Sequence, residues 1–215
     1  MPSSPIAVVT CGPAYEPIDS VRRITNHSTG EIGVFLSDAL AARGFHVVCF
    51  RGEMATFPAP SSAQVHSFTT NDSLEALFAG LPAAPAVIFH AAALSDYRVG
   101  SVKGARVTGK IRSDLKELVI HLTPATKLLP LLPEMFPQAL IIGWKYELDG
   151  TCEEALERGR HQVAAVGTAG CVVNGRAYGE GFGFLEDGEV RHFADKRFLA
   201  AHLADWSWRR VALDA

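Results

Sequence analysis

The stretch that decides the fold of this chain is TCGPAYEPIDSVRRITNHSTGEIG at residues 10–33, a polar segment between two apolar ones. The run before it, IAVVT at residues 6–10, is short and continuous, which is typical of a strand buried on both faces of a parallel sheet. After it, apolar residues recur with helical spacing from Ile32 to Leu40. Such connections usually have about two to six residues, so a loop of about twenty predicts a functional role.

Further strands and helices alternate along the chain after this first unit. The expected strands cover residues 45–50, 64–68, 86–93, 139–144 and 170–174, and the expected helices cover residues 71–81, 124–132 and 151–165. Asn71 is the expected cap of the first of these helices, and Thr151 and Glu154 form a capping box at the start of the last. This alternation predicts an α/β fold, Rossmann-like and doubly wound around a mainly parallel sheet.

Two segments depart from the alternation. Residues 98–117 are glycine-punctuated and locally basic, and the apolar alternation after them predicts a small β-arm built as a hairpin of residues 107–112 and 117–122. Near the C-terminus, Asp187-Gly188 predicts a hairpin turn between two short strands. A helix with an apolar face follows, and that face is expected to contain Phe198, Leu199, His202, Leu203 and Trp206. We therefore expect one domain over residues 1–215 with an arm at about 98–122.

The composition excludes several classes of protein. The net charge of −3 gives no global attraction to nucleic acid or to an anionic membrane. The four cysteines show neither CxxC nor Cys/His spacing, which argues against a zinc site and for a reducing compartment. The N-terminus lacks the basic region of a signal peptide, and no stretch has membrane-spanning length. We expect a soluble cytoplasmic protein with no nucleic-acid or membrane partner.

The long loop does not contain the dinucleotide motif of a Rossmann enzyme. The first turn reads CGPAYEP rather than GxGxxG. The second strand ends in Phe50-Arg51-Gly52, so the acidic residue expected there is also absent. Small residues still precede the helix, where backbone N–H groups and the helix dipole favour an anion. A simple helix cap would explain Ser28, Thr29 and Gly30 equally well, but not the neighbouring Arg22, Arg23, Asn26 and His27.

Five segments together resemble the phosphopantothenoylcysteine synthetase (phosphopantothenate–cysteine ligase) family. They are GPAYEPIDSVRRITNHSTGEIG at 12–33, HAAALSDYR at 90–98, GKIRS at 109–113, GWKYE at 143–147 and CVVN at 171–174. The resemblance implies an enzyme of coenzyme A biosynthesis that activates the carboxylate of 4'-phosphopantothenate with CTP or ATP. An acyl-nucleotidyl anhydride forms, and the amine of cysteine then displaces the nucleotide. Mg²⁺ would accompany the triphosphate with few protein ligands, and no metal-ligating residue is assigned.

The resemblance also implies roles for single residues. Gly12, Ser28, Thr29 and Gly30 would line the phosphate-binding turn, and Ala92, Ala93 and Asp96 would line the nucleotide pocket. Asn26 would hold the acyl-nucleotide for amide formation, and Asn174 would end the final strand beside the nucleotide. Lys110 would close over the triphosphate on the arm, although an isolated charge cluster is more often a solvated surface. The arm implies a homodimer, because it packs against a partner subunit in relatives.

Other candidate residues have competing structural explanations. Trp144 could pack on a base, or it could belong to the core. Glu147 could accept hydrogen bonds or contact a metal, or it could be an ordinary acidic residue at the start of a helix. His27, His90 and His121 are more often structural than catalytic, and no cysteine adjoins an activating group.

The chain departs from the family pattern at Lys145, Tyr146, Ala169 and Gly175, and in the short segment YGEGFGFLEDG. No flavin-binding domain precedes residue 6, so we expect no flavin. The departures leave a second hypothesis open, a diverged nucleotide-binding protein that is non-catalytic or repurposed. An NAD(P)-dependent reductase is the weakest alternative, because the dinucleotide motif and a Tyr-x-x-x-Lys pair are missing.

Overall fold

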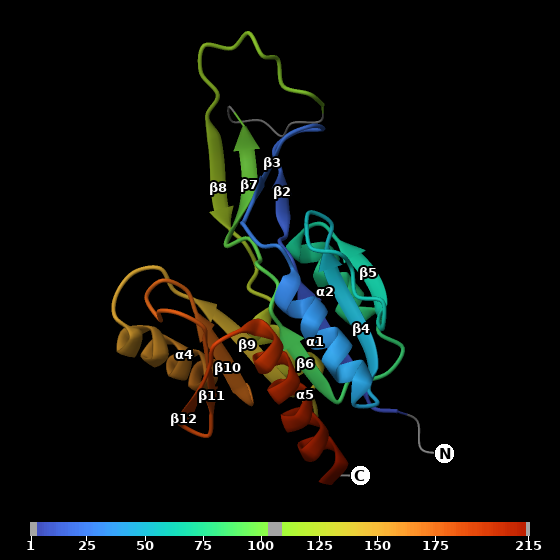
Figure 1. Cartoon of the computed structure of the whole chain (residues 1–215). Coiled ribbons are helices and arrows are strands. Elements are labelled where there is room, and N and C mark those ends of the chain that lie inside the picture. The colour runs from blue at the N-terminus through green and yellow to red at the C-terminus, as the bar shows by residue number, and fades with distance from the viewer. Residues whose placement is uncertain (1–3, 103–108, 214–215) are drawn as a thin grey trace.

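The structure is a computed structural model that describes residues 4–102 and 109–213. Its centre is an eight-stranded sheet in the order β12-β11-β10-β9-β6-β1-β4-β5 (Figure 1). The parallel strands are β1 (Ile6–Cys11), β4 (His46–Gly52), β5 (Gln64–Phe68), β6 (Val87–His90), β9 (Leu140–Tyr146) and β10 (Gly170–Asn174). An antiparallel hairpin of β11 (Phe182–Glu186) and β12 (Glu189–Phe193) completes the sheet. The predicted Rossmann-like, mainly parallel fold is confirmed.

The strand order reverses at β1. From β1 the chain builds β4 and β5 on one side, and it then returns to build β6, β9 and β10 on the other. β1 pairs with β4 from Ile6↔His46 to Cys11↔Arg51, and its other edge pairs with β6. In open α/β sheets, ligands bind beyond the carboxyl ends of the strands at such a reversal.

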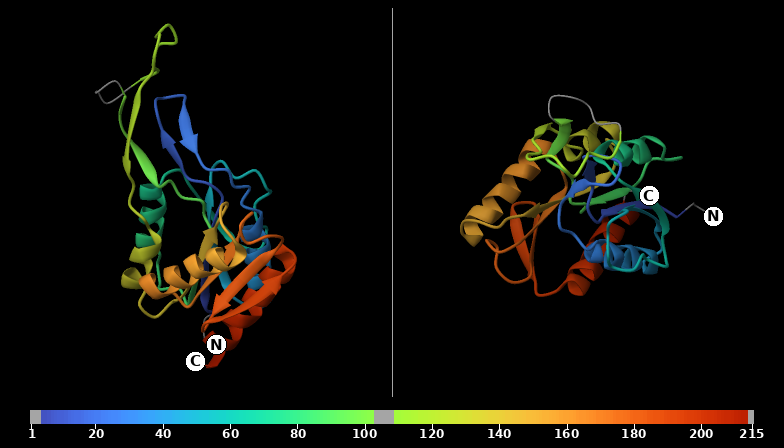
Figure 2. Two further views of the ribbon diagram at one scale, coloured as in Figure 1. Left: turned by 90° about the vertical axis from the view of Figure 1, so that its left-hand side faces the viewer. Right: turned by 90° about the horizontal axis from the view of Figure 1, so that it is seen from above.

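Helices cover both faces of the sheet, which explains the continuous apolar runs (Figure 2). On one face lie α1 (Glu31–Ala42) and α5 (Lys196–Leu213), and on the other lie α2 (Asn71–Ala79), the 3-10 turn η1 (Leu129–Leu131), α3 (Leu132–Met135) and α4 (Cys152–Val166). Val9 packs into the core cluster under α1 and α5, whereas Val8 packs into the one under α2 and α3. A central strand therefore has no polar face. In the described part of the chain, no helix has the length and apolarity needed to cross a membrane.

Two hairpins project from the carboxyl edge of the sheet and form what we call the arm (Figure 1). One consists of β2 (Tyr15–Pro17) and β3 (Arg23–Thr25), and the other of β7 (Tyr97–Val102) and β8 (Ile120–Pro124). Residues 109–119, which precede β8, also belong to the arm and contain no strand.

The predicted pairing of residues 107–112 with 117–122 is wrong, since β7 pairs with β8 instead. Residues 107 and 108 lie outside the described residues. Within residues 109–112, the backbone is bound elsewhere: the N–H of Ile111 donates to Asp19 Oδ2 at 3.0 Å, and the carbonyl of Ile111 accepts from Arg22 at 3.2 Å. The turn of the β2–β3 hairpin therefore replaces the expected partner strand.

Three local expectations are also corrected. The cap of α2 is Thr70, which accepts from the N–H of Ser73, while Asn71 bonds to the backbone of Ser95. Pro124 ends β8 rather than starting a helix, and regular turns begin only at Leu129. Phe198 is 67% exposed and not part of the buried face of α5. The capping box at Thr151 and the turn at Asp187-Gly188 are confirmed.

Candidate functional site

The loops that follow β1 and β6 are joined by backbone hydrogen bonds. The N–H of Ala93 donates to the carbonyl of Gly12 at 3.0 Å, and the N–H of Ala14 donates to the carbonyl of Ala93 at 3.0 Å. The hydroxyl of Thr10 accepts from the N–H of Ala92 at 3.1 Å. The structure therefore places Gly12, Ala92 and Ala93 together at the strand-order reversal, as the sequence predicted for loops that share one edge.

The turn after β1 also lies directly against the start of α1. Gly12 and Gly30 both have left-handed backbones, with φ of +76° and +81°. A Cβ added to Gly12 would lie 2.7 Å from the Cβ of Ala55, and one added to Gly30 would lie 3.1 Å from that same atom. Both positions therefore need glycine for conformation and for space. We call residues 12–14, 28–30 and 92–94 the cradle.

The N-terminus of α1 opens into the cradle without a side-chain cap. The N-cap residue is Gly30, and the hydroxyl of Thr29 accepts from the N–H of Glu31 at a long 3.3 Å. Ser28 is half-buried and Thr29 is exposed. The capping explanation for these residues therefore has little support, and the helix dipole remains available to an anion.

Arg51 fixes the loop that packs on both glycines, and sequence reasoning missed this role. Its Nη2 donates to the carbonyls of Ala55 and Phe57, at 2.6 Å each. The N–H of Phe57 in turn donates to the carbonyl of Thr29 at 3.0 Å. The Nε of Arg51 is buried with no partner among the described residues. The signal was a basic residue where a Rossmann enzyme has an acidic one.

Asn26 bridges the two sides of the cradle. Its Nδ2 donates to the carbonyl of Leu94 at 2.6 Å, which joins the end of the long loop to the segment after β6. The preceding Thr25 is fixed too, since its hydroxyl donates to the carbonyl of Ala14 at 2.7 Å. The Asn26 side chain is exposed, so its orientation comes from these bonds rather than from packing.

The side chains of Asp96 and Lys110 are exposed and are not fixed to the cradle by hydrogen bonds among the described residues. The carbonyl of Asp96 accepts from the N–H of Ala125 at 2.9 Å, but its side chain is exposed. Lys110 is exposed beside Ile111, which is bound to the turn of the β2–β3 hairpin. Residues 109–119 lie beyond the ends of β7 and β8, on the side away from the main sheet (Figure 1).

The end of β9 contains three of the unusual residues. Trp144 is half-buried and packs against the core under α1 and α5, which favours its structural explanation. Glu147 accepts from Arg158 at 2.7 Å and pairs with Lys145 at 3.2 Å, so two cations already occupy its carboxylate. Tyr146 is 64% exposed at the carboxyl edge. Lys145 is therefore a structural cation, and Tyr146 is the aromatic group available to a ligand.

Asn174 lies beside Tyr146 in the register of β10 and β9. Its Oδ1 is buried without a partner in the described chain, and its carbonyl accepts from the N–H of Glu147 at 2.8 Å. Gly175 has φ of +111°, and a Cβ there would lie 2.3 Å from the carbonyl oxygen of Glu147. The departure at Gly175 is therefore required by the local backbone. Ala169, like Trp144, is partly buried and packs against the core cluster under α1 and α5.

His90, Cys11 and Cys171 do not fit a catalytic role in this region. Burial lowers the pKa of His90 to about 4, and its Nδ1 lies 3.1 Å from the hydroxyl of Thr10, so the ring is neutral and structural. Cys11 and Cys49 are buried with their sulfurs 3.8 Å apart. The hydrogen bond to Cys49 and burial raise the pKa of Cys11, and burial raises that of Cys171 to about 12. Neither Cys11 nor Cys171 is therefore an activated thiolate.

A cavity of about 700 Å³ separates the two hairpins of the arm, next to the start of α2. Glu16, Asp19 and Asp72 line it with one cation, Arg98. Burial raises the pKa of Glu16. This acidic cavity does not suit a polyphosphate, in contrast to the cradle. Over residues 4–102 and 109–213, His, Cys, Asp and Glu form no group of three that could hold a metal ion.

Comparison with known proteins agrees with this geometry. The model of the "DNA/pantothenate metabolism flavoprotein C-terminal domain" family matches residues 4–212. The bifunctional coenzyme A biosynthesis protein CoaBC of Thermococcus kodakarensis is 31% identical over 212 residues, which cover 95% of this chain and 50% of that protein. The chain thus spans about half the length of this curated relative.

Two solved structures share the fold. The DNA/pantothenate metabolism flavoprotein of Streptococcus pneumoniae superposes with a TM-score of 0.85 at 23% identity, covering 96% of this chain and 100% of that one. A Cab2 mutant in complex with phosphopantothenate-cysteine superposes with a TM-score of 0.77 at 18% identity, covering 98% and 87%. Because the family model matches nearly the whole sequence, the chain belongs to the DNA/pantothenate metabolism flavoprotein C-terminal domain family.

Proposed function

We propose that this chain is a phosphopantothenate–cysteine ligase that works through an acyl-nucleotide. A carboxylate oxygen of 4'-phosphopantothenate attacks the α-phosphorus of CTP or ATP, and pyrophosphate leaves. The amine of cysteine then attacks the acyl carbon, the nucleoside monophosphate leaves, and the amine loses a proton. The observation that supports this proposal most is the uncapped α1 N-terminus against the Gly12 turn, at the strand-order reversal of a chain that matches the family over residues 4–212.

The cradle suits the polyphosphate part of this reaction. Backbone N–H groups and a helix N-terminus bind phosphate oxygens without long side chains, and Ser28 and Thr29 add hydroxyl donors. Gly12 and Gly30 let the backbone approach the ligand closely. Mg²⁺ would arrive with the triphosphate and keep most of its waters, so it does not need a cluster of carboxylates.

Asn26 is the residue that we assign to the acyl group. Its bond to Leu94 holds the side-chain amide across the cradle, where Oδ1 can accept a hydrogen bond from the attacking amine. Ala92, Ala93 and Asp96 would border the nucleotide on the β6 side. On the β9 and β10 side, Asn174 offers a buried Oδ1 with no partner among the described residues, and Tyr146 offers an exposed ring. Trp144 would support this wall from the core.

The arm supports a homodimer in which Lys110 closes over bound triphosphate. The arm exposes apolar side chains, including Val21 at 57%, Tyr97 at 56% and Leu122 at 44%. Such a group of exposed side chains is typical of an interface. The 109–119 segment lies away from the sheet of its own chain, so Lys110 would act on the cradle of a partner subunit or after the arm moves.

The direct test is pyrophosphate release from CTP, and separately from ATP, with 4'-phosphopantothenate and cysteine present or omitted. We expect release only when 4'-phosphopantothenate is present, and the faster of the two nucleotides identifies the cosubstrate. Tight nucleotide binding without release under any of these conditions would instead support the diverged, non-catalytic protein.

Asn26→Asp separates the two half-reactions. We expect slower amide formation with activation less affected, so the acyl-nucleotide should accumulate in rapid-quench samples analysed by mass spectrometry. His27→Asn is the matched control, because His27 is the exposed neighbour to which we assign no role. Normal product formation by Asn26→Asp would remove Asn26 from the mechanism.

A further inference from the structure

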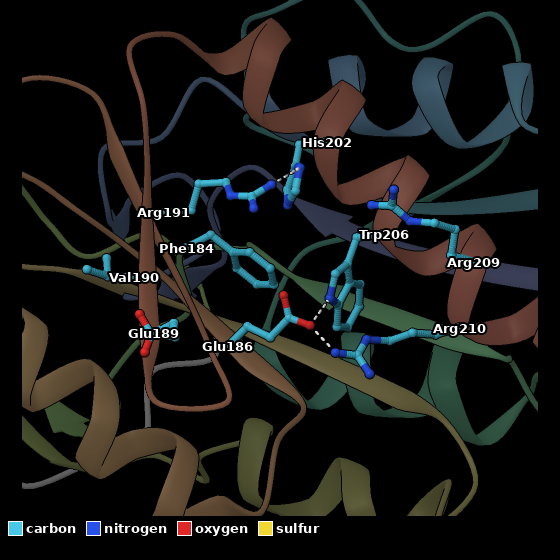
Figure 3. A pocket seen from close by; sticks show the side chains of 9 residues that line it. All are labelled: Phe184, Glu186, Glu189, Val190, Arg191, His202, Trp206, Arg209 and Arg210. Atoms are coloured by element: carbon cyan, nitrogen blue, oxygen red, sulfur yellow. Dashed lines mark hydrogen bonds and ion pairs between the residues drawn. The ribbon is translucent and has the colours of Figure 1, made fainter.

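A second cavity of about 480 Å³ lies between the β11–β12 hairpin and α5 (Figure 3). Leu185 of β11 pairs with Cys171 near the start of β10, so Glu186 and the turn after it lie at the amino edge of the sheet. The cradle lies at the carboxyl edge, at the opposite end of the strands. This cavity therefore does not belong to the site described above.

Three arginines line this cavity. Arg191 comes from β12, and Arg209 and Arg210 come from α5. Arg191 reaches His202, with Nη1 3.4 Å from Nδ1 of the imidazole (Figure 3). Among the described residues, neither Arg191 nor Arg209 forms an ion pair with a carboxylate. An arginine without a counter-ion beside a cavity can bind an anion through a forked pair of hydrogen bonds.

Two carboxylates line the cavity, Glu186 and Glu189, and Glu189 forms no ion pair among the described residues. Glu186 accepts from the indole N–H of Trp206 and from Arg210. Burial opposes its ionisation, but these two hydrogen bonds outweigh burial and lower the pKa of Glu186. Glu186 is therefore paired with Arg210, whereas Arg191 and Arg209 have no carboxylate partner among the described residues.

The pKa of the His202 imidazole reflects its burial and the positive charge of Arg191 and Arg209. Burial lowers the pKa of His202, and the charges of Arg191 and Arg209 lower it further, against Glu186 and Asp205. Asp205 is directed elsewhere, because it pairs with Arg43, the residue that follows α1. A negatively charged ligand at this rim would relieve the repulsion between the two arginines.

Three of the residues that line the cavity are apolar. Phe184 and Trp206 form an edge-to-face pair with centroids 5.5 Å apart at the floor, and Val190 is 42% exposed at the side. The volume is within the range of small-molecule sites, about 300–1,000 Å³, and is larger than a bare phosphate needs. The cavity thus combines a cationic rim with an apolar body.

From this combination we propose a second ligand site, which binds a small organic phosphate through Arg191 and Arg209 and places its apolar part against Phe184, Val190 and Trp206. The site is separate from the cradle. It does not depend on the proposed ligase activity.

Phenyl phosphate is the probe, with inorganic phosphate and phenol as the two halves of its chemistry. Binding is followed by NMR at the indole N–H of Trp206, assigned with Trp206→Phe, so that a phosphate bound in the cradle is not counted. We expect phenyl phosphate to shift this signal at lower concentration than inorganic phosphate does, and phenol to leave it unchanged.

The double variant Arg191→Gln with Arg209→Gln should bind phenyl phosphate at least about tenfold more weakly. Arg112→Gln with Arg197→Gln removes the same charge from arginines outside the cavity and should bind like the unmodified protein. All four arginines are exposed, so folding is not at risk. An unmoved Trp206 signal, equal affinity in the two double variants, or equal binding of phenol would each overturn the proposal.

Discussion

The cradle is held by backbone hydrogen bonds between buried strands, whereas the arm consists of short hairpins that expose apolar side chains. Ala93 bonds to both Gly12 and Ala14 beneath the cradle. In the arm, β3 is exposed along its whole length and Tyr97 is 56% exposed. The comparison teaches that one chain builds the cradle by itself, while the arm presents surface that only a partner or a ligand can cover.

The largest effect should come from the arm. We expect Lys110→Ala to lower turnover by about 100- to 1,000-fold, because one positioned charge that stabilises a developing anion contributes on this scale. The free energy of unfolding should not change, since Lys110 is exposed. Steady-state kinetics measures the turnover and urea unfolding measures the free energy of unfolding. Lys116→Ala, in the same segment, is the control. Unchanged turnover would exclude Lys110 from the reaction.

Gly12→Ala should distort the cradle. We expect turnover to fall about 100-fold, because the phosphate groups of the substrate would be displaced. Its matched control is Gly167→Ala, which has the same φ of +76° but nothing within 4 Å of the added Cβ. Both variants should lose about 1 kcal/mol from the left-handed backbone. Only Gly12→Ala also meets Ala55, so equal activity of the two variants would contradict the cradle.

Acid should weaken the strands under the cradle before it weakens the arm. His90 has a folded pKa of about 4 and an unfolded pKa of about 6.5, so the unfolded state takes up a proton first. The free energy of unfolding therefore keeps the full contribution of neutral His90 above pH 6.5. It loses this contribution as pH falls towards 4, and the loss is on the order of 2 kcal/mol by pH 5. His90→Gln should flatten that dependence in urea unfolding, whereas His46→Gln on the exposed start of β4 should not. The same slope in both variants would contradict this explanation.

Asp19 keeps the arm stable to a lower pH than the strands under the cradle. Burial opposes its ionisation, but the N–H groups of Ile111, Val21 and Arg22 outweigh burial and lower its pKa. The folded pKa lies below the unfolded one, so this stabilisation persists down to about pH 4 and is lost only below it.

Asp19→Asn should therefore loosen residues 109–119, with about fivefold faster proteolysis there at pH 7. Asp114→Asn, which removes an exposed ion pair with Arg112, is the control. Equal cleavage of the two variants would show that Asp19 does not hold the segment.

The sequence predicted the cradle better than the arm for a physical reason. Buried strands such as β1 and β6 need continuous apolar runs, and helix spacing repeats over several turns in α1, so both are readable in the chain. The expected site residues Gly12, Gly30, Ala92, Ala93 and Asn26 come together because the topology fixes where those strands end.

The arm could not be predicted because nothing local specifies its pairing. β7 and β8 are joined by a long connection and lie mostly exposed, so they lack an alternating pattern. The role of Asp19 depends on a contact with Ile111, 92 positions later in the chain. Arg51 was missed because its partners are backbone carbonyls, which leave no trace in side-chain motifs.

The central claim is that the cradle joins the carboxylate of the substrate to the α-phosphorus of a nucleotide. Its most direct test is turnover of 4'-phosphopantothenate with oxygen-18 in the carboxylate, followed by mass spectrometry of the nucleoside monophosphate. The proposal predicts one oxygen-18 atom in the monophosphate for each amide formed. Amide formation without label in the monophosphate, or with label in inorganic phosphate instead, would contradict it.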